Sequence, residues 1–316
     1  MNVLVTGANG FIGNHLTTLL VNQDYQIRLG LRDTSNPSLC GDKLSLVKYD
    51  LGIINNNYEN LLKNIEIVVH RAGIAHRQSA DENEYIKINS EGTLRLAEQA
   101  AARGVKRFIF LSTVKVHGET NDVIDNVLKP ITEMSKANPC DGYSKSKLEA
   151  EKAIIEVCES SNMDYIILRP PLVYGPGVKA NFLKLLQFVS HRFPLPFAGI
   201  NNKRSLIYVE NLCDLINIFI NSTLEGNQTY LVKDCDISTP DLITEIASAL
   251  DSTPRLFSLP RKIFDLVGRI FNQKAVIERV AGSLFVDDSK LRRDIIWSPP
   301  INTKTAVQRT VAWLAC

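Results

Sequence analysis

The amino-terminal residues constrain the fold of this chain more than any other feature. The apolar run Val3–Val5 leads into three glycines, Gly7, Gly10 and Gly13, at a G-x-x-G-x-x-G spacing, and an amphipathic segment follows. This order predicts a strand, a tight turn and a helix. The first glycine permits positive φ, the second removes a Cβ that would block a pyrophosphate, and the third lets the helix approach the strand. Phosphates would lie at the positive end of the helix, so the motif predicts a dinucleotide site.

Short apolar strands alternate with helical stretches over the first 170 residues. This alternation predicts βαβ units and a parallel sheet with helices on both faces, and ligands then bind beyond the carboxyl ends of the strands. The expected fold class is α/β, a Rossmann-type doubly wound parallel sheet with a smaller carboxyl-terminal α+β domain. The expected strands are Val3–Val5, Gln26–Leu31, Ser45–Tyr49, Ile67–His70, Phe108–Leu111 and Tyr165–Leu168, and the expected helices are Gly10–Val21, Glu82–Arg103 and Ser144–Glu159.

The character of the chain changes after Pro170, where helical patterns are joined by loops that contain proline and glycine. We therefore expect one domain over residues 1–170 and a second over residues 171–316, which closes over the cofactor cleft. The boundary is soft, because a segment near Tyr230 is a candidate to return to the first domain. The expected helices of the second part are Asn181–His191, Glu210–Ser222, Pro240–Leu250 and Thr303–Leu314.

Composition excludes several classes of function. The 316 residues carry a formal net charge of +2 without a basic stripe, which argues against nucleic-acid binding. No apolar run is long enough to cross a bilayer, and a strand that starts at Asn2 leaves no room for a signal peptide. Histidines and cysteines lack metal-ligand spacing, so we expect no metal and reduced thiols in a cytoplasmic protein. The cysteines are Cys40, Cys140, Cys158, Cys213, Cys235 and Cys316.

A second motif places a tyrosine and a lysine four residues apart, Tyr143 and Lys147, on one face of an expected helix. A phenol with a pKa of roughly 10 is a poor acid–base group near neutrality, but a nearby ammonium lowers that pKa. The pair is therefore a candidate to move a proton at a carbinol oxygen. The same spacing also occurs on ordinary exposed helix surfaces.

A third motif favours the catalytic interpretation. The apolar strand Phe108–Leu111 ends in two hydroxyl residues, Ser112 and Thr113. A hydroxyl at the carboxyl end of a sheet strand faces the ligand and can hold a substrate oxygen. The glycine-rich turn, the strand-end hydroxyls and the Tyr/Lys pair follow one another along the chain.

With these motifs the chain resembles the extended short-chain dehydrogenases/reductases, in the NAD-dependent epimerase/dehydratase family of nucleotide-sugar enzymes. The resemblance extends over nearly the whole chain. The further matching segments are Asp50-Leu51, Val68–Gly73, Asn89–Thr93, Leu168–Pro176 and Arg204–Leu212.

The resemblance implies roles for individual residues. Thr113 matches the catalytic hydroxyl, Tyr143 the acid–base and Lys147 its partner. Thr113, Asn181 and Arg204 match contacts to a UDP-sugar; Arg204 suits a phosphate, whereas Asn181 is also a candidate to cap the helix that it begins. The residues that match cofactor contacts, with Arg32 added from the argument below, are Gly7, Asn9, Gly10, Phe11, Ile12, Gly13, Arg32, Asp50, Leu51, Ala72, Gly73, Asn89, Ser112, Tyr143, Lys147 and Pro170.

Four positions depart from the commonest family pattern. His117 replaces a tyrosine, Gly73 replaces an alanine, and Arg71 is unusual at its position. Pro171 falls where many epimerases place a substrate-contacting asparagine, which weakens an assignment to glucose/galactose epimerization.

The end of the second strand bears on the cofactor. NAD-binding chains place an acidic residue near Leu31, where it accepts from the ribose 2′-hydroxyl. Here Arg32 follows, and an arginine can pair with a 2′-phosphate, so NADP is the expected cofactor. The alternative is NAD, with Asp33 on the ribose after a small shift in register.

An NADP-type strand end favours a reductase. Segments around Lys115 and over Lys179–Pro196 resemble bacterial polysaccharide-gene enzymes that reduce UDP-4-keto-6-deoxy-N-acetylhexosamines, so this reduction is the expected reaction. The first alternative is a UDP-hexose 4-epimerase, acting on glucose/galactose or N-acetyl sugars. The second is an inert NADP-binding regulatory or scaffold protein. Family analogy also implies a homodimer that pairs the helices Glu82–Arg103 and Ser144–Glu159.

Overall fold

The computed structural model describes residues 1–34, 41–75, 81–125, 127–259 and 281–315. Contacts divide the chain into two compact units. Unit 1 comprises Met1–Gly118, Ser135–Pro170 and Leu212–Leu231, and unit 2 comprises Glu119–Met134, Pro171–Asn211 and Val232–Cys316. Residues 119–134 precede the expected boundary at residue 170 but belong to unit 2. Residues 212–231, which contain Tyr230, follow that boundary but belong to unit 1.

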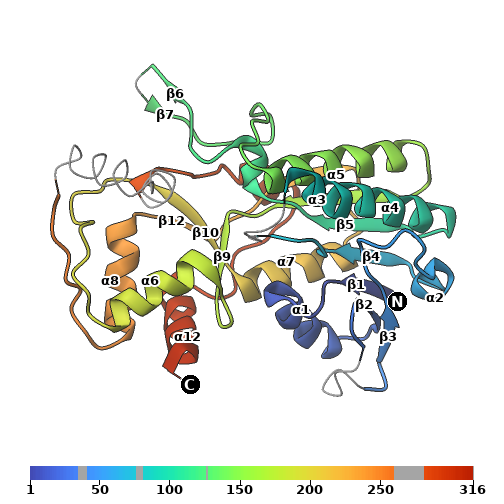
Figure 1. Cartoon of the computed structure of the whole chain (residues 1–316), viewed down its shortest axis with the longest axis horizontal. Helices are drawn as coiled ribbons and strands as arrows, with labels where there is room; N and C mark the ends of the chain where they lie inside the picture. The colour runs from blue at the N-terminus through green and yellow to red at the C-terminus, as the bar shows by residue number, and fades with distance from the viewer. Residues whose placement is uncertain (35–40, 76–80, 126, 260–280, 316) are drawn as a thin grey trace. The chain divides into compact units, whose positions relative to one another are not determined.

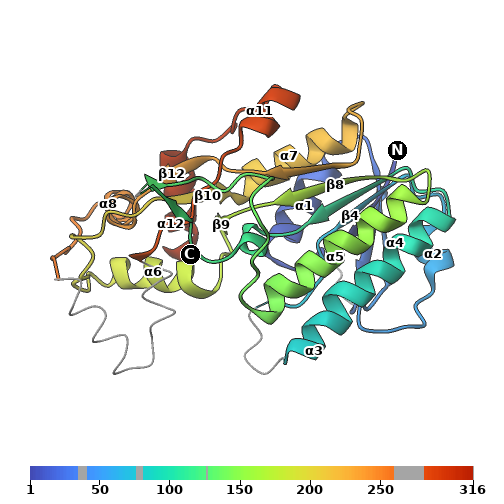
Figure 2. The same cartoon turned by 90° about the horizontal axis from the view of Figure 1, so that it is seen from above.

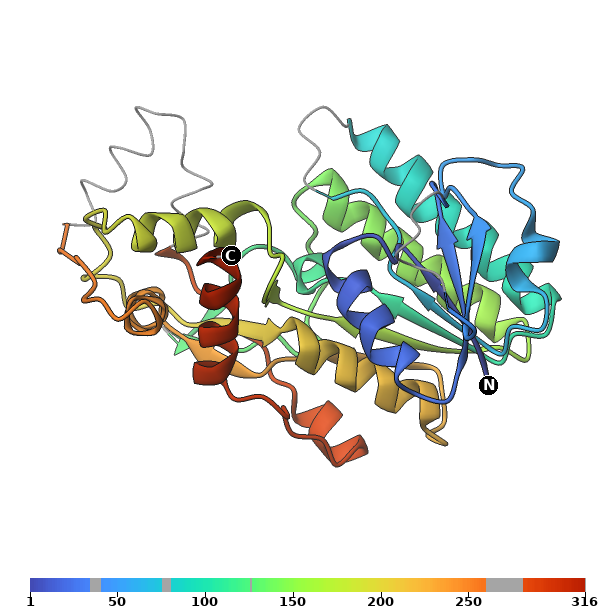
Figure 3. The same ribbon diagram turned by 90° about the horizontal axis from the view of Figure 1, so that it is seen from below.

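Unit 1 contains a seven-stranded sheet in the order β11-β8-β5-β4-β1-β2-β3, in which every pair is parallel. The central strands are buried along their whole length, as is usual for a parallel sheet covered on both faces. Figure 3 shows the blue strands fanned beside the blue helix α1. The strands are β1 (Asn2–Thr6), β2 (Gln26–Leu31), β3 (Leu44–Lys48), β4 (Ile67–His70), β5 (Arg107–Leu111), β8 (Asp164–Arg169) and β11 (Gln228–Leu231).

Helices cover both faces of this sheet, which makes it a doubly wound Rossmann-type fold. Helices α4 and α5 lie side by side on one face, and α1 and α7 lie on the other (Figure 1, Figure 2). The core under α4 and α5 includes Leu96, Ala97, Ala150 and Ile154, all fully buried. The helices are α1 (Phe11–Val21), α2 (Tyr58–Leu62), α3 (Glu82–Tyr85), α4 (Gly92–Ala102), a 3-10 turn η3 (Val114–His117), α5 (Gly142–Glu159) and α7 (Val209–Asn221).

The six strands expected from the sequence are confirmed, with ends that differ by at most one residue. The helix expected over Glu82–Arg103 is interrupted. A π-helical segment, η2 (Ile86–Glu91), separates α3 from α4 and carries the buried Asn89. The spacing of apolar residues did not predict the π-helical segment. Asn89 within it is held by hydrogen bonds to residues distant in the sequence, such as Ser146, which local spacing does not report.

Unit 2 contains a three-stranded sheet in the order β12-β10-β9, with β10 parallel to β9 and antiparallel to β12. Helix α8 packs against both α6 and α12. The four helices expected after residue 180 are confirmed, whereas this sheet was not assigned from sequence. The elements are β6 (Val123–Ile124), β7 (Val127–Leu128), β9 (Leu172–Tyr174), α6 (Ala180–Ser190), β10 (Arg204–Tyr208), β12 (Cys235–Ile237), α8 (Thr239–Ala249), α11 (Ser289–Asp294) and α12 (Thr303–Ala315).

No helix among the described residues is both long and apolar enough to span a bilayer. Cys140, Cys158, Cys213 and Cys235 form no disulfide among the residues that the structure describes. Cys40 and Cys316 lie outside the described residues.

Candidate functional site

The glycine-rich loop between β1 and α1 has the geometry expected of a phosphate-binding turn. Gly7 has a φ of 71°, a conformation that side chains rarely adopt, and its carbonyl accepts from the Gly10 amide at 3.1 Å. A Cβ at Gly13 would lie 2.7 Å from the Cα of Ala8 and would overlap the Gly7 carbonyl. The positive φ and the close approach of helix to strand are therefore confirmed.

The second glycine has an unexpected neighbour. The guanidinium of Arg71, the residue after β4, donates from Nη1 to the Gly7 carbonyl. A Cβ at Gly10 would overlap this guanidinium. The side chain that the sequence marked as unusual thus lies over the glycine-rich loop.

The carboxyl end of β5 carries the two strand-end hydroxyls. The Ser112 amide donates to the Leu168 carbonyl at 2.8 Å and the Val114 amide to the Pro170 carbonyl at 3.0 Å, which aligns this end with that of β8. Thr113 Oγ1 accepts from the Lys115 amide at 3.3 Å. The Oγ of Ser112 is buried without a hydrogen-bond partner in the described part of the chain. Since buried polar groups are normally hydrogen-bonded, this hydroxyl is a candidate to bind a ligand.

Helix α5 brings Lys147 to the same end of β5. Asp141 and Ser144 form a capping box that sets where this helix begins. The Lys147 Nζ donates to the Leu111 carbonyl at 2.8 Å and lies 4.4 Å from the ring centroid of Phe110. Tyr143, one turn earlier, packs edge-on against Tyr85, with ring centroids 6.4 Å apart.

The electrostatics of the Tyr/Lys pair differ from expectation. Burial raises the pKa of Tyr143 to about 12, and the cation that lowers it most is Arg71. Burial, followed by repulsion from Arg71, lowers the pKa of Lys147 to about 7. The prediction that a neighbouring ammonium leaves this phenol with a lowered pKa is wrong in this structure, because desolvation outweighs the nearby charge.

The sequence did not predict a buried ion pair between Arg169, at the end of β8, and Glu151, on α5. Arg169 binds Glu151 through two contacts, Nε–Oε1 at 3.0 Å and Nη2–Oε2 at 2.6 Å, and its Nη1 lies 2.9 Å from Nε2 of His117. Glu151 lies one turn after Lys147 and raises the pKa of that lysine against the effect of burial. His117, the departure from tyrosine, is thus part of a charged network. The sequence signal available was only the i+4 spacing of Lys147 and Glu151.

Asn89 fixes the loop that follows β4. Its Oδ1 accepts from the Ile74 amide at 2.8 Å, and its Nδ2 donates to the Ile74 carbonyl and to Ser146 Oγ, each at 3.0 Å. A Cβ at Gly73 would lie 2.9 Å from Asn89 Oδ1, so the glycine at this position makes room for the amide. The adjacent Ala72 amide donates to Thr6 Oγ1 at 3.3 Å. The amide group of Asn89 therefore positions the loop.

The remaining candidate cofactor residues lie on loops of unit 1 and in the first turn of α1. The Asp50 carboxylate accepts from the Gly52 amide at 2.9 Å, and Leu51 is buried in the core. Asn9 is exposed, whereas Phe11 and Ile12 in the first turn of α1 are half-buried.

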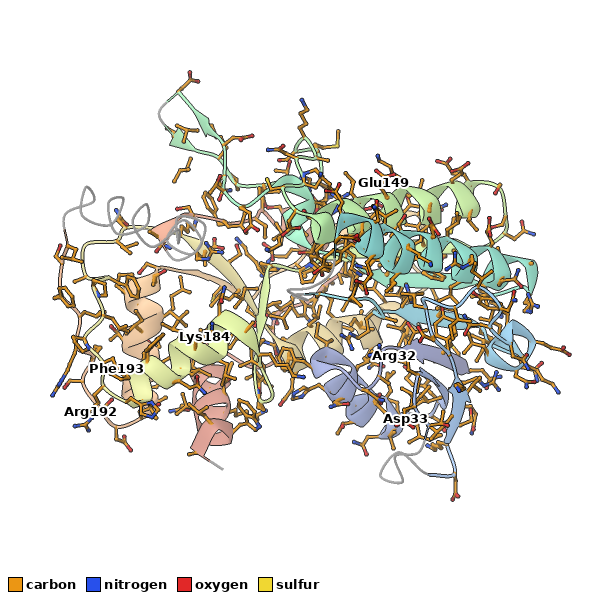
Figure 4. All side chains as sticks on the ribbon, in the orientation of Figure 1. Arg32, Asp33, Glu149, Lys184, Arg192 and Phe193 are labelled. Atoms are coloured by element: carbon orange, nitrogen blue, oxygen red, sulfur yellow. The ribbon has the colours of Figure 1, made fainter. Side chains whose placement is uncertain are left out.

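Arg32 and Asp33 follow the carboxyl end of β2, and both side chains are exposed (Figure 4). Arg32 is the candidate for a 2′-phosphate and Asp33 for the ribose hydroxyls, so the position of the strand end does not by itself distinguish the two cofactors.

Unit 2 holds the other two candidate residues. Asn181 is exposed in the first turn of α6, and the cap residue of that helix is Lys179, so the interpretation of Asn181 as a cap is wrong. The preceding residue, Ala180, has a φ of 56°. Arg204 begins β10, is half-buried and donates from Nη1 to the Gly282 carbonyl at 3.0 Å. Pro171 directly precedes β9.

Comparisons with known proteins agree with this architecture. Residues 3–232 match the family described as "NAD dependent epimerase/dehydratase family". The chain is 38% identical to a "UDP-glucose 4-epimerase" of Vibrio cholerae, over 98% of this chain and 94% of that protein.

Solved structures of low identity share the fold. A UDP-glucuronic acid 4-epimerase from Bacillus cereus in complex with NAD has a TM-score of 0.80 at 20% identity and covers 100% of this chain and 99% of its own. MoeE5 in complex with UDP-glucuronic acid and NAD has a TM-score of 0.78 at 21% identity, with the same coverage. The family match over most of the chain and the full-length relative identify this protein as a member of the NAD dependent epimerase/dehydratase family.

Proposed function

We propose that this protein is a UDP-sugar 4-epimerase that uses a nicotinamide dinucleotide. The observation that carries the proposal is the full-length similarity to a protein named UDP-glucose 4-epimerase, at 38% identity. It favours the epimerase alternative from the sequence over the expected reductase. Pro171 keeps the choice between glucose/galactose and N-acetyl sugars open.

The residues of unit 1 fit a dinucleotide. Gly7, Gly10 and Gly13 lack the Cβ atoms that would block the turn and the close packing of α1. The loop leads into the amino terminus of this 11-residue helix, where a phosphate is favoured. The unsatisfied Ser112 Oγ supplies a further polar group at the end of β5. When bound, the cofactor supplies the acceptor and donor of hydride at C4 of the sugar.

The protein's own residues then handle the proton. For this step Tyr143 must enter as the phenolate: it takes the proton of the 4-hydroxyl as the sugar is oxidised, and returns it to the 4-keto oxygen after the sugar has turned over, which regenerates the phenolate. Thr113 holds the same oxygen through its hydroxyl. Lys147 supports Tyr143 and, by family analogy, binds the nicotinamide ribose. Asn181 and Arg204 hold the uridine diphosphate, Arg204 through charge-assisted hydrogen bonds to phosphate.

For the resident cofactor we propose NAD, which is named in the complexes of both structural relatives described above. NADP is the alternative, favoured by the exposed Arg32 after β2. Mass spectrometry of nucleotide released from the purified protein distinguishes them by the 2′-phosphate. Arg32→Asp should lower affinity for NADP far more than for NAD if Arg32 contacts that phosphate.

The function is tested by incubating the protein with UDP-galactose, and in parallel with its N-acetyl counterpart, and by reading the configuration at C4 by NMR. The expected result is interconversion with no net change in NADH or NADPH absorbance. Tyr143→Phe is the matched control, since it removes one hydroxyl and leaves the ring. Stoichiometric oxidation of NADPH with a UDP-4-keto-6-deoxy-N-acetylhexosamine would instead establish the reductase.

Wild-type protein that retains nucleotide but turns over neither class of sugar would support the inert alternative.

We also propose a homodimer through the exposed faces of α4 and α5. A cavity between these two helices, within unit 1, is lined by Leu94, Ala101 and Val157 among others. Light scattering at micromolar concentration tests the assembly, and a monomer there would contradict it.

A further inference from the structure

Arg71 occupies a place in unit 1 that its role in the fold does not explain. It follows β4, 64 residues after Gly7, and its side chain crosses to the loop between β1 and α1. There Nη1 donates to the Gly7 carbonyl, and the guanidinium fills the space that the missing Cβ of Gly10 leaves open. This is the space that a dinucleotide-binding loop keeps for a diphosphate.

The electrostatic setting of Arg71 is unfavourable without an anion. The amino terminus of α1 carries a partial positive charge, and a cation beside it is repelled. Within the described residues Arg71 has no ion pair with a carboxylate, and the Gly7 carbonyl is a neutral acceptor. Burial also lowers the pKa of Arg71, because desolvation adds a separate cost to holding this charge.

A purely structural role does not require the charge. One neutral donor suffices to satisfy the Gly7 carbonyl, and a glutamine side chain offers one. What a guanidinium adds is a planar fork of donors that matches two phosphate oxygens at once. Together with the helix terminus, it gives the loop two sources of positive potential directed at the same space.

We propose that Arg71 is a diphosphate-binding residue of the cofactor site, which turns its free donors from the glycine-rich loop to the phosphate oxygens of the bound dinucleotide. The proposal rests on the dinucleotide binding included in the proposed function. It adds a charged contact from the end of β4 to the uncharged glycine-rich loop.

The test uses ADP-ribose, which carries the diphosphate without nicotinamide, and adenosine, which lacks it. After removal of co-purified nucleotide, each is titrated by calorimetry into the wild type, Arg71→Gln and Arg293→Gln. Arg293 is an exposed arginine in the last turn of α11 in unit 2, so its variant matches the loss of charge. Arg71→Gln should weaken ADP-ribose binding by about tenfold to a hundredfold, as a charge-assisted contact predicts, and reduce its salt dependence. Adenosine binding should stay the same in all three proteins.

Equal affinity of wild type and Arg71→Gln for ADP-ribose, or tighter binding by the variant, would overturn the role of Arg71 while leaving the cofactor proposal in place. Wild-type protein that binds neither ADP-ribose nor NAD(P) would overturn both.

Arg71→Lys covers the case in which Arg71→Gln does not fold. It keeps the charge but replaces the fork by a point charge, so ADP-ribose should bind about threefold to tenfold more weakly, with adenosine unchanged. Identical ADP-ribose affinity in Arg71→Lys and the wild type would contradict the fork contact.

Discussion

The two units present their candidate residues in different ways. In unit 1, Lys147, Asn89 and Thr113 are buried, and each is held by named hydrogen bonds to strand ends or loops. In unit 2, Asn181 is exposed on the first turn of α6 and Arg204 is half-buried at the start of β10. In the proposed function, the groups for chemistry therefore lie at buried, hydrogen-bonded positions of unit 1, whereas the contacts to the uridine diphosphate lie at more exposed positions of unit 2. Substitutions in unit 1 should therefore affect turnover, and those in unit 2 the binding of substrate.

The largest expected effect is that of Tyr143→Phe. Loss of the transferable proton should lower kcat by about 10²–10⁴-fold, as for other general acid–base groups. The ring that packs against Tyr85 is kept, so KM for the UDP-sugar should change little. Steady-state kinetics on the C4 interconversion measure both values. A rise in KM with kcat intact would reverse the assignment of unit 1 to turnover.

Comparison of the wild type with Lys147→Met tests whether burial lowers the pKa of Lys147, through the pH dependence of the free energy of unfolding. The folded pKa of Lys147, about 7, lies below its ordinary value, so between the two the unfolded chain binds a proton that the folded chain has released. The free energy of unfolding of the wild type should therefore rise with pH above 7, by up to about 1.4 kcal/mol per unit, relative to that of Lys147→Met. Below pH 7 the difference should level off. Urea unfolding at a series of pH values checks this, and parallel curves for the two proteins would show that the lysine is not desolvated.

Arg204→Gln should act in the opposite sense to Tyr143→Phe. It removes a charge-assisted contact proposed for the uridine diphosphate, so KM for the UDP-sugar should rise by about tenfold to a hundredfold with a smaller change in kcat. Free UDP, used as a competitive inhibitor, should weaken by the same factor. If UDP binds to the variant as it does to the wild type, Arg204 has a structural role, to which its hydrogen bond to the Gly282 carbonyl belongs, and does not bind the diphosphate.

Asn181→Ala should have the smallest effect. The side chain is exposed and does not cap its helix, so the free energy of unfolding, measured by thermal unfolding, should be unchanged within about 0.5 kcal/mol. Loss of one neutral hydrogen bond to the nucleotide should raise KM about threefold to tenfold. An unchanged KM would show that Asn181 does not contact the substrate. Arg204 would then be the one remaining proposed substrate contact in unit 2.

The sequence by itself determined the order of βα units, the turn at Gly7 and the close packing at Gly13. These features depend on apolar periodicity and on backbone conformations that few residues adopt, and both are local properties. Local apolar periodicity also predicted the ends of α6, α7, α8 and α12 to within one residue.

Tertiary structure alone decided the electrostatics of the site. Its key contacts join residues that are between 15 and 64 positions apart in the sequence. They are the hydrogen bonds of Arg71 to Gly7, of Arg169 to Glu151 and His117, and of Asn89 to Ile74. Such pairings depend on how helices and strands pack, which spacing does not report. The pKa of Tyr143 rises because desolvation outweighs a neighbouring cation, and that balance exists only once the chain has folded.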